Sequence, residues 1–364
     1  MVSELPVLEI SGGPREKGHA HGEIMRSEIR ELISGFRETV LEHSKGRNHT
    51  ISQEWWRNWA LQNVPYISNY YPDLLEEVEA IAKSANVSLE DILCLNLFLD
   101  IWDWVTPHIF QGRYGRAQGC TAFGISGLTN SQEAIIGQNY DLEALFQKGA
   151  ILLRINDRGG TKSLVFTIAG IVGCAGLNNH GLAVVINNLT ARDAQAGVPY
   201  PFIIRRLLFS SNIGESIDSI VGAQRSSGMN YMLASKCGAV ISIESSAIEY
   251  VVSNSFNQPI THANHYLQDR LIPQEARSIV DRGHSIYRQY RTEYLLNKIE
   301  NYDMENLFKI LRDHQNHPIG ICRHDEPEDT CGKTIASMVF LPRQQRAYFT
   351  AGNPCESEFR EYQL

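Results

Sequence analysis

The stretch RAQGCTAFGIS, residues 116–126, marks the point at which the chain changes character. Before it, apolar residues recur at the three- and four-residue steps of amphipathic helices, and after it short β-forming runs alternate with turn residues. Within the stretch, Gly119 stands directly before Cys120. One interpretation is a buried cysteine that packs as a small apolar residue at the start of a strand. The other is that Cys120 becomes a new N-terminus when the chain is cut.

The segment before Cys120 is predicted to be mainly helical. The apolar spacing from Arg15 to about Lys45 predicts one amphipathic helix with a charged outer face. Farther along, Pro72 suits a first helical turn, and Ser88 is a suitable cap for another helix. The segment also contains all five tryptophans, which we interpret as packing anchors, with a substrate-facing aromatic wall as the alternative. They are Trp55, Trp56, Trp59, Trp102 and Trp104.

The segment after Cys120 is predicted to mix strands and helices. Its first five β-rich runs, from Cys120 to about residue 188, predict an antiparallel meander. Helices are expected near residues 200–225 and over 284–313, with strands between and after them. Sheets interleaved with helix pairs predict an α+β fold, a four-layer αββα sandwich with helices on both outer faces. We therefore divide the chain into a helical segment, 1–119, and a catalytic segment, 120–364, which together form one globular unit.

Composition excludes several classes of function. The 364 residues carry a net charge of −8, which argues against nucleic acid as a partner. The longest apolar runs fall far short of the roughly 20 residues that a membrane helix needs, and acidic residues near the start argue against a signal peptide. Seven cysteines are an odd number and show no repeating spacing. They indicate a reducing compartment, so we expect a cytoplasmic protein.

Thiol catalysis at Cys120 would need a base, because a free cysteine with a pKa of about 8.5 is mostly protonated at neutral pH. The surrounding sequence has no pattern typical of cysteine proteases that use histidine. An α-amino group, with a pKa of about 7.7 to 8.0, is an alternative base on the nucleophile itself. That role requires a cut between Gly119 and Cys120. Glycine favours such a cut because it tolerates strained backbone geometry without a Cβ clash.

Several motifs resemble, in order, those of one enzyme family. They are SGGPREKGHAHGE near the start, then GCTAFG, IIGQNYDLE, GLNNHGLAVVINNLT, THANHYLQ, ILRDHQNHPIGICRH, TIASMVF and GNPCESEF. This order is similar to that of the acyl-coenzyme A:6-aminopenicillanic acid acyltransferase family of cysteine N-terminal-nucleophile (Ntn) hydrolases. The resemblance covers nearly the whole chain. It implies an αββα sandwich, autocatalytic cleavage between Gly119 and Cys120, and two tightly associated fragments.

The resemblance also implies roles for particular residues. Cys120 matches the nucleophile, and Asp141 matches the carboxylate that holds the freed amine. Asn264 resembles the side-chain donor of the oxyanion hole, and Arg323 matches the arginine near the nucleophile. More distantly, Asn188 falls where related bile-salt and penicillin V hydrolases place a second oxyanion residue. The implied chemistry needs no metal and no organic cofactor.

Physical reasoning supports part of this assignment independently. A hairpin that begins at Cys120 can return its partner strand so that Asp141 lies near the nucleophile. A carboxylate there would orient the ammonium group, and an arginine such as Arg323 would hold that carboxylate or one on the substrate. The sequence departs from the penicillin acyltransferase pattern at Gln118, where that pattern has aspartate, and at Gly320, where it has serine. These departures make penicillin a doubtful substrate.

Other histidines and cysteines are candidate metal ligands. His19 and His21 are two residues apart, which points them in different directions on a helix. Cys322, His324 and Cys331 offer zinc-binding atoms, but no Cys-x-x-Cys pair accompanies them. We therefore predict no metal site. The remaining candidates are interpreted as structural cysteines or as exposed or hydrogen-bonded histidines, namely Cys94, Cys174, Cys237, Cys355, His314 and His317.

These observations predict a self-processing cysteine amidohydrolase. Its substrate would be a small N-acyl or aminoacyl amine, cleaved through a thioester acyl-enzyme. The partners expected are this substrate and the enzyme's own N-terminal fragment, without nucleic acid or membrane. One alternative is an acyltransferase that passes the acyl group to a second amine, with acyl-coenzyme A as a candidate donor. Another is an unprocessed, non-catalytic homologue in which Cys120 belongs to the core.

Overall fold

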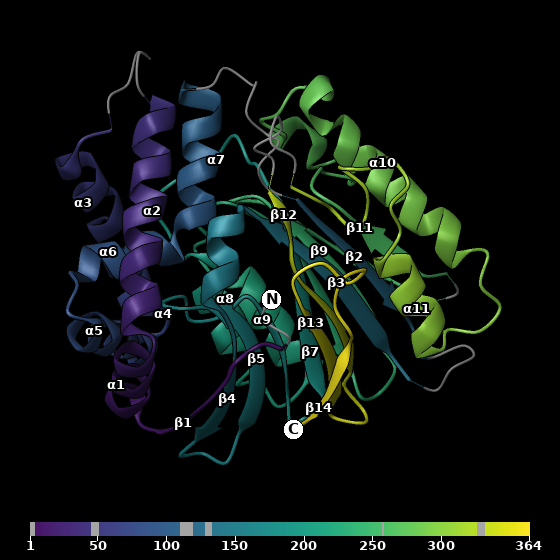
Figure 1. Ribbon diagram of the computed structural model, residues 1–364, viewed down its shortest axis with the longest axis horizontal. Coiled ribbons are helices and arrows are strands. Elements are labelled where there is room, and N and C mark those ends of the chain that lie inside the picture. The colour runs from purple at the N-terminus through teal and green to yellow at the C-terminus, as the bar shows by residue number, and fades with distance from the viewer. Residues whose placement is uncertain (1–3, 45–50, 110–118, 128–132, 257, 326–331) are drawn as a thin grey trace.

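Two stacked β-sheets form the middle of the molecule, and helices cover both outer faces (Figure 1). The computed structural model describes all residues except 1–3, 45–50, 110–118, 128–132, 257 and 326–331. The eight-stranded sheet has the order β1-β4-β5-β6-β7-β8-β9-β10, and the six-stranded sheet has the order β11-β2-β3-β12-β13-β14.

The strands of the eight-stranded sheet are β1 (Val7–Gly12), β4 (Ala150–Asp157), β5 (Lys162–Ile168), β6 (Ala175–Asn178), β7 (Leu182–Leu189), β8 (Gly228–Ser235), β9 (Val240–Ser245) and β10 (Tyr250–Asn254). Those of the six-stranded sheet are β2 (Gly119–Ile125), β3 (Ile135–Leu142), β11 (Ile260–His262), β12 (Lys333–Leu341), β13 (Arg346–Ala351) and β14 (Arg360–Gln363). Every residue of β2, β3 and β7 is buried. The two sheets are also joined by hydrogen bonds, because the Gln138 side chain on β3 pairs with both main-chain groups of Ile186 on β7.

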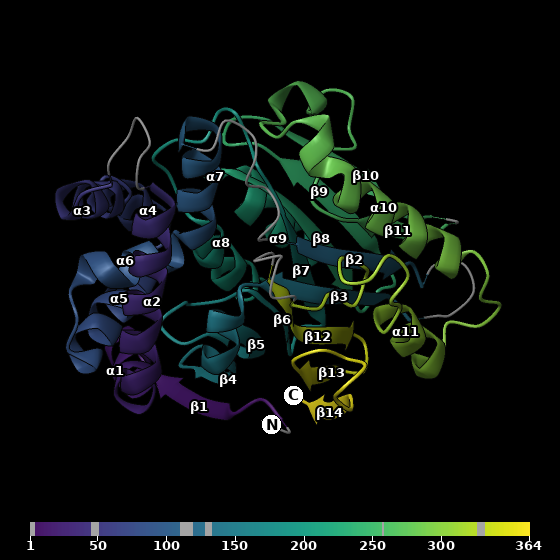
Figure 2. The ribbon, with the colours of Figure 1, turned by 45° about the horizontal axis from the view of Figure 1, so that its top comes forward.

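Helices of the N-terminal segment lie on one side of the sheets and two late helices lie on the other (Figures 1 and 2). The first group is α1 (Pro14–Ile24), α2 (Arg26–Ser44), α3 (Gln53–Leu61), α4 (Val64–Tyr70), α5 (Pro72–Ala85), α6 (Leu89–Asn96) and α7 (Phe98–Ile109), with α8 (Tyr200–Leu207) and α9 (Ile213–Val221) beside them. The second group is α10 (Ile279–Leu296) and α11 (Met304–Leu311). Leu296 and Leu307 from these helices pack with Phe123 of β2. The layers are therefore helix, sheet, sheet and helix, and the predicted αββα sandwich is confirmed.

The helix-capping predictions are confirmed. Pro72 occupies the first turn of α5, and the Ser88 hydroxyl accepts the backbone N–H of Asp91 at the start of α6. This cap satisfies one of the backbone donors that a helix start leaves without an intrahelical partner.

The single helix predicted from Arg15 to Lys45 is wrong, because α1 ends at Ile24 and α2 begins at Arg26. The break follows from the close approach of α1 to α5. A Cβ at Gly18 would lie 2.1 Å from the carbonyl oxygen of Glu77, and one at Gly22 would lie 2.4 Å from that of Ile81. Apolar periodicity continues across Met25, but the backbone turns there so that α1 can stay against α5.

The predicted single meander after Cys120 is also wrong. β2 and β3 pair in the six-stranded sheet, whereas β4 to β7 belong to the other sheet. The 3₁₀ helix η1 (Ala144–Gly149) carries the chain from one sheet to the other. A second short 3₁₀ helix, η2 (Ile272–Gln274), precedes α10. Short β-forming runs identify strands, but they do not say which sheet each strand joins.

The segment 1–119 is mainly helical, yet it also contributes a strand. β1 pairs in parallel with β4 at the edge of the eight-stranded sheet, with Ile10 opposite Ile155. The segment also supplies buried packing, since Trp56 and Trp59 of α3 are buried. The two predicted segments are thus interleaved in one fold, while their separation by cleavage at residue 119 stays a prediction.

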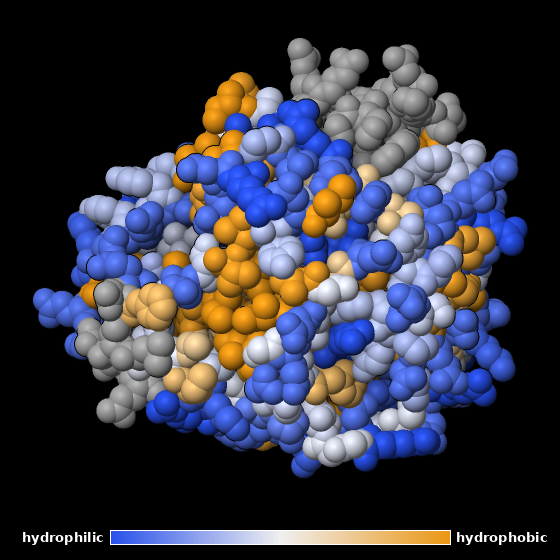
Figure 3. All heavy atoms as spheres, turned by 180° about the vertical axis from the view of Figure 1, so that it is seen from behind, coloured by the Kyte–Doolittle hydropathy of each residue, from blue (hydrophilic) through white to orange (hydrophobic). Residues whose placement is uncertain are grey.

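Figure 3 shows the face opposite that of Figure 1, where apolar side chains gather near the middle among charged ones. In the part of the chain that the structure describes, none of the helices has the length and apolar character that crossing a membrane requires.

Candidate active site

Cys120 is the second residue of β2, opposite Tyr140 of β3, and its side chain is buried. Its backbone N–H donates to the Oδ1 atom of Asn264 over 2.7 Å. Burial raises the pKa of the Cys120 thiol to about 12, and the nearby charge of Asp141 contributes to this rise. In the uncut chain the thiol is therefore protonated at neutral pH, so catalysis needs a base.

Asn264 holds the nitrogen of Cys120 through its side-chain oxygen. Oδ1 accepts both this N–H and the Nη2 atom of Arg288, which lies 2.7 Å away. Because a backbone N–H and a guanidinium can only donate, the oxygen and not the amide nitrogen must face them. The amide nitrogen donates instead to the backbone oxygen of Asn188 over 3.1 Å. The contacts thus place Asn264 at the nucleophile, and its oxyanion role stays a prediction.

Asp141 lies opposite Gly119 in the β2–β3 pairing. The hairpin argument therefore placed this carboxylate correctly beside the predicted cleavage site. Its Oδ1 atom accepts the hydroxyl of Thr334 over 2.7 Å, whereas its buried Oδ2 atom accepts no hydrogen bond from the described residues. Burial raises the pKa of Asp141 to about 6, although Arg288, Arg323 and Thr334 act in the opposite direction. A half-satisfied carboxylate with a pKa near neutrality is suited to exchanging protons.

Arg323 is buried and lies against Gly119. A Cβ added to Gly119 would lie 2.8 Å from Nη1 of Arg323 and 3.1 Å from Oδ2 of Asp141. Gly119 does not adopt a positive φ among the described residues, so the expected backbone strain is not the reason for glycine here. The reason is space, because a side chain would displace the guanidinium.

A short loop fixes the backbone of Arg323. Its N–H donates to the Thr334 hydroxyl over 3.0 Å, and its carbonyl oxygen accepts the side-chain amide of Asn353 over 2.6 Å. The same Thr334 hydroxyl donates to Asp141, so one threonine connects the arginine loop to the carboxylate. A hydroxyl both donates and accepts, which allows this connection.

Arg288 was missed by the sequence analysis. It lies on α10, is buried, and donates from Nε to the hydroxyl of Thr121 over 3.1 Å as well as to Asn264. Burial lowers its pKa to about 10. The one signal in the sequence that could have indicated Arg288 is its helical spacing from Ser285 and Thr292. These three residues lie on the buried face of α10. That face is polar as well as buried, which is unusual for a helix that covers a sheet.

Asn188 reaches this region through its backbone. Its side-chain amide donates to Oδ1 of Asp103 on α7 over 3.0 Å, and its backbone oxygen accepts from Asn264. Asp103 also accepts the hydroxyl of Ser227 over 2.6 Å, and burial raises its pKa to about 6. Sequence reasoning did not identify Asp103, whose contacts join the N-terminal segment to strands on the other side of the predicted cut.

The nearby histidines are engaged elsewhere. His262 contacts Glu244 through Nε2 at 3.0 Å, and His265 contacts the Ser285 hydroxyl through Nδ1 at 2.8 Å. Burial lowers the pKa of His265 to about 3, which keeps this imidazole neutral. Among the contacts of the described residues, neither ring meets Cys120. This arrangement favours a base other than histidine.

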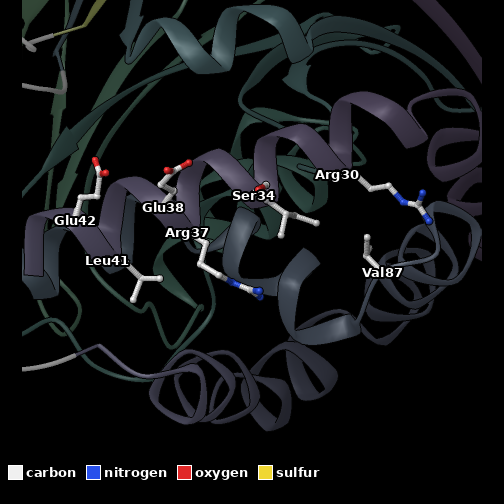
Figure 4. A pocket seen from close by; sticks show the side chains of 8 residues that line it. Arg30, Ser34, Arg37, Glu38, Leu41, Glu42 and Val87 are labelled. Carbon is white, nitrogen blue, oxygen red and sulfur yellow. The ribbon is translucent and has the colours of Figure 1, made fainter.

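One surface pocket lies away from these residues. It has a volume of about 470 Å³, and Figure 4 shows its lining side chains on α2 together with Val87. Arg30, Arg37 and Glu38 give it a mixed charge. None of the predicted catalytic residues lines it.

Comparison with known proteins gives the family. The model of the family described as acyl-coenzyme A:6-aminopenicillanic acid acyl-transferase matches residues 128–356. The 40 kDa form of acyl-coenzyme A:6-aminopenicillanic-acid-acyltransferase from Emericella nidulans is 27% identical over 348 residues, covering 94% of this chain and 91% of that protein. An uncharacterized protein of Archaeoglobus fulgidus is 21% identical over 272 residues, covering 67% of this chain and 45% of that protein.

Two solved structures are more distant. A variant of conjugated bile acid hydrolase from Clostridium perfringens aligns with a TM-score of 0.46 and 14% identity, over 67% of this chain and 97% of that one. Penicillin V acylase from Agrobacterium tumefaciens aligns with a TM-score of 0.42 and 11% identity, over 64% of this chain and 83% of that one. The family match covers more than half of the chain. The chain therefore belongs to the acyl-coenzyme A:6-aminopenicillanic acid acyltransferase family.

Proposed function

We propose that this protein is a self-processing cysteine amidohydrolase in which Cys120 is the nucleophile and its freed α-amine is the base. The observation that carries the proposal is the bond from the Cys120 nitrogen to Asn264. This hydrogen bond holds the backbone nitrogen that would become the free amine after cleavage. In the described part of the chain, the Cys120 thiol has no histidine partner that could act as the base instead. Family membership supports amide hydrolysis or acyl transfer as the class of reaction.

The first step is cleavage of the chain itself. The Cys120 sulfur attacks the carbonyl carbon of Gly119, the bond from that carbon to the Cys120 nitrogen breaks, and the thiol proton ends on the nitrogen. Water then hydrolyses the resulting thioester, which leaves a carboxylate on Gly119 and both a free thiol and a free amine on Cys120. Asp141 is the proposed proton carrier, because its Oδ2 atom lies beside Gly119 without a partner among the described residues.

The mature site would then act on an external amide. The α-amine takes the thiol proton as sulfur attacks the substrate carbonyl, and it returns that proton to the departing amine. Asn264 keeps the amine in place through Oδ1, as it keeps the peptide nitrogen now. The Asn264 side-chain amide nitrogen carries two N–H donors, and one of them binds the backbone oxygen of Asn188. The other N–H is the proposed donor to the oxyanion.

Mass spectrometry of the purified protein tests the proposal. We expect two fragments that meet between residues 119 and 120 and stay together under native conditions. Cys120→Ala should give one intact chain without amidase activity, and loss of the nucleophile should lower kcat on the order of 10⁶-fold. Cys94→Ala is the matched control, because Cys94 is also a buried cysteine but its thiol contacts the backbone oxygen of Trp56 in the N-terminal helices. An active wild-type chain that is never cut would refute the proposal.

Acyl transfer is the second candidate, favoured by the 27% identity to an acyltransferase over 94% of this chain. Both reactions share the acyl-enzyme and differ in whether water or an amine accepts the acyl group. Adding an amine acceptor at increasing concentration to a hydrolysis assay separates them. A transferase yields mainly the new amide at low acceptor concentration, whereas a hydrolase continues to release the free acid.

A further inference from the structure

Four side chains that the proposed catalysis does not use meet at one place near the surface. They are His314 after α11, Cys322 and His324 on the loop that carries Arg323, and Cys355 after β13. Their ligand atoms all lie within 4.8 Å of one another. Two thiols and two imidazoles from three separate stretches of chain form the donor set of a structural zinc site.

The distances among Cys322, Cys355 and His324 fit one tetrahedral ion, and His314 lies beside them at a spacing slightly shorter than a tetrahedron has. The two sulfurs of Cys322 and Cys355 are 3.6 Å apart, and Nε2 of His324 lies 3.6 Å and 3.4 Å from them. Nε2 of His314 lies 3.0 Å from Nε2 of His324. Zinc bonds of about 2.3 Å to sulfur and 2.0 to 2.1 Å to nitrogen place ligand atoms about 3.3 to 3.8 Å apart in a tetrahedron. A disulfide is a poorer description, because its sulfurs would be about 2.0 Å apart.

The surroundings also resemble those of a metal centre. Nε2 of His324 faces the two sulfurs, while its Nδ1 atom faces the Glu356 carboxylate at 3.7 Å. The Asn353 amide points at the Cys322 sulfur at 3.6 Å. Carboxylates behind ligand histidines and donors to ligand sulfurs are the usual outer partners of protein zinc. Asn353 connects the cluster to the catalytic residues, since the same amide holds the backbone of Arg323.

We propose that His314, Cys322, His324 and Cys355 bind one structural Zn²⁺ ion, which fixes the loop that presents Arg323 to Gly119. The sequence analysis excluded a metal here because it sought paired cysteines and grouped Cys322 and His324 with Cys331. Cys331 lies outside the described residues. The fold instead supplies His314 and Cys355, and Cys355, interpreted from the sequence as a structural cysteine, contacts both Cys322 and His324.

Metal analysis of the full chain tests the site directly. Protein purified under reducing conditions from zinc-supplied cells should contain about one zinc per chain by mass spectrometry. After exchange for Co²⁺, thiolate charge-transfer bands and visible bands of a tetrahedral ion should appear. Cys322→Ser and Cys355→Ser should each lose the zinc and the bands. Because Cys322 is buried and its variant risks misfolding, the surface variant His314→Ala provides a second test.

Three controls should keep the zinc, namely Cys237→Ser, Cys331→Ser and His317→Asn. The ring of His317 lies 5.2 Å from that of His324 but is not one of the four ligands, so this variant tests the geometry rather than the number of histidines. Glu356→Gln should weaken zinc affinity about 10-fold, as loss of an outer carboxylate does. Cys120→Ala should also keep the zinc, which separates this proposal from the proposed cleavage.

Several outcomes would overturn the zinc site. Native protein that contains no zinc and gives no Co²⁺ bands is one, and an intact mass showing a disulfide between Cys322 and Cys355 is another. Retention of zinc in both Cys322→Ser and Cys355→Ser would also refute it. So would loss of zinc in Cys331→Ser or His317→Asn, because the ligand set would then be different.

Discussion

Two buried clusters of charge in this molecule are built in opposite ways. In the Glu77 cluster, which joins Glu77, Arg205, Lys17 and Asp157, both carboxylate oxygens of Glu77 accept from Arg205 at 2.9 Å, and Lys17 lies 3.7 Å away. In the Cys120 cluster, which joins Cys120, Asp141, Asn264, Arg288 and Arg323, the Oδ2 atom of Asp141 accepts no hydrogen bond from the described residues.

The protonation equilibria reflect this difference. The pKa of Arg205 is raised, because its interactions with Glu77 and other acidic groups outweigh the effect of burial, whereas the pKa of Arg288 falls to about 10 and that of Asp141 rises to about 6. A carboxylate that is paired at both oxygens, as Glu77 is by Arg205, favours the charged form of its partner and holds α5 and α8 together. An incompletely paired cluster destabilises its charged forms, which suits it to move protons. The comparison predicts that removing a charged group lowers the free energy of unfolding in the Glu77 cluster, whereas in the Cys120 cluster it slows the cleavage reaction.

The largest expected effect is on chemistry, in Asp141→Asn. Removing the proposed proton carrier should slow chain cleavage by up to about 10⁴-fold, the range of general acid–base catalysis. The free energy of unfolding should fall little or even rise, because the variant removes a buried charge. Cleavage is followed by time-resolved denaturing electrophoresis, and stability by urea unfolding. Equal cleavage rates in variant and wild type would remove Asp141 from the mechanism.

The next effect is on stability, in Glu77→Gln. This change leaves the Arg205 charge buried without its carboxylate, which should lower the free energy of unfolding by about 3 to 5 kcal/mol. Glu76→Gln is the matched control, because Glu76 is the neighbouring residue on α5 and pairs with the exposed Arg15. It should change stability by less than about 1 kcal/mol. Slower chain cleavage in Glu77→Gln with an unchanged free energy of unfolding would contradict the proposed difference between the two clusters.

A smaller effect on chemistry is expected from Arg288→Gln. Asn264 would lose a charged donor, and only its bonds to Asn188 and to the Cys120 nitrogen would then hold its side chain. We expect cleavage to slow by about 10²-fold, the lower end of the range for losing one oriented donor at a reacting centre. Arg282→Gln lies on the same helix and donates to the backbone of Ser278, so it serves as the control. Comparable slowing in both variants would show a general effect on α10.

The smallest effect is a pH dependence of stability. The pKa of Asp141 is about 6 in the fold and about 3.9 in an unfolded chain, so the folded state binds the proton more tightly. Its destabilising contribution is complete above pH 6 and is relieved as pH falls from 6 towards 4. Between pH 8 and pH 5 this should stabilise the wild type relative to Asp141→Asn by about 1 to 2 kcal/mol. Urea unfolding of both forms in a Cys120→Ala background, where neither chain is cut, measures the difference at several pH values, and a gap that is constant with pH would contradict it.

Much of the fold was predictable because it depends on local patterns. Short β-forming runs between turn residues identified strands such as β2 and β3, and the cap at Ser88 and the proline at Pro72 marked helix starts. The placement of Asp141 followed from hairpin geometry alone, since the β2–β3 register sets it opposite Gly119. The break at Met25 was not predictable, because it depends on the distance between α1 and α5.

The sequence by itself determined the strand that begins at Gly119, the thiol next to it, and the carboxylate opposite, because these lie within one hairpin. Only the tertiary structure brought Asn264 to the Cys120 nitrogen, Arg288 to Asn264, and His314 and Cys355 to Cys322. Those residues come from elements far apart in the chain, and their neighbours depend on how sheets and helices stack. Periodicity describes each element along its own axis, whereas such contacts depend on packing between elements, which no local pattern encodes.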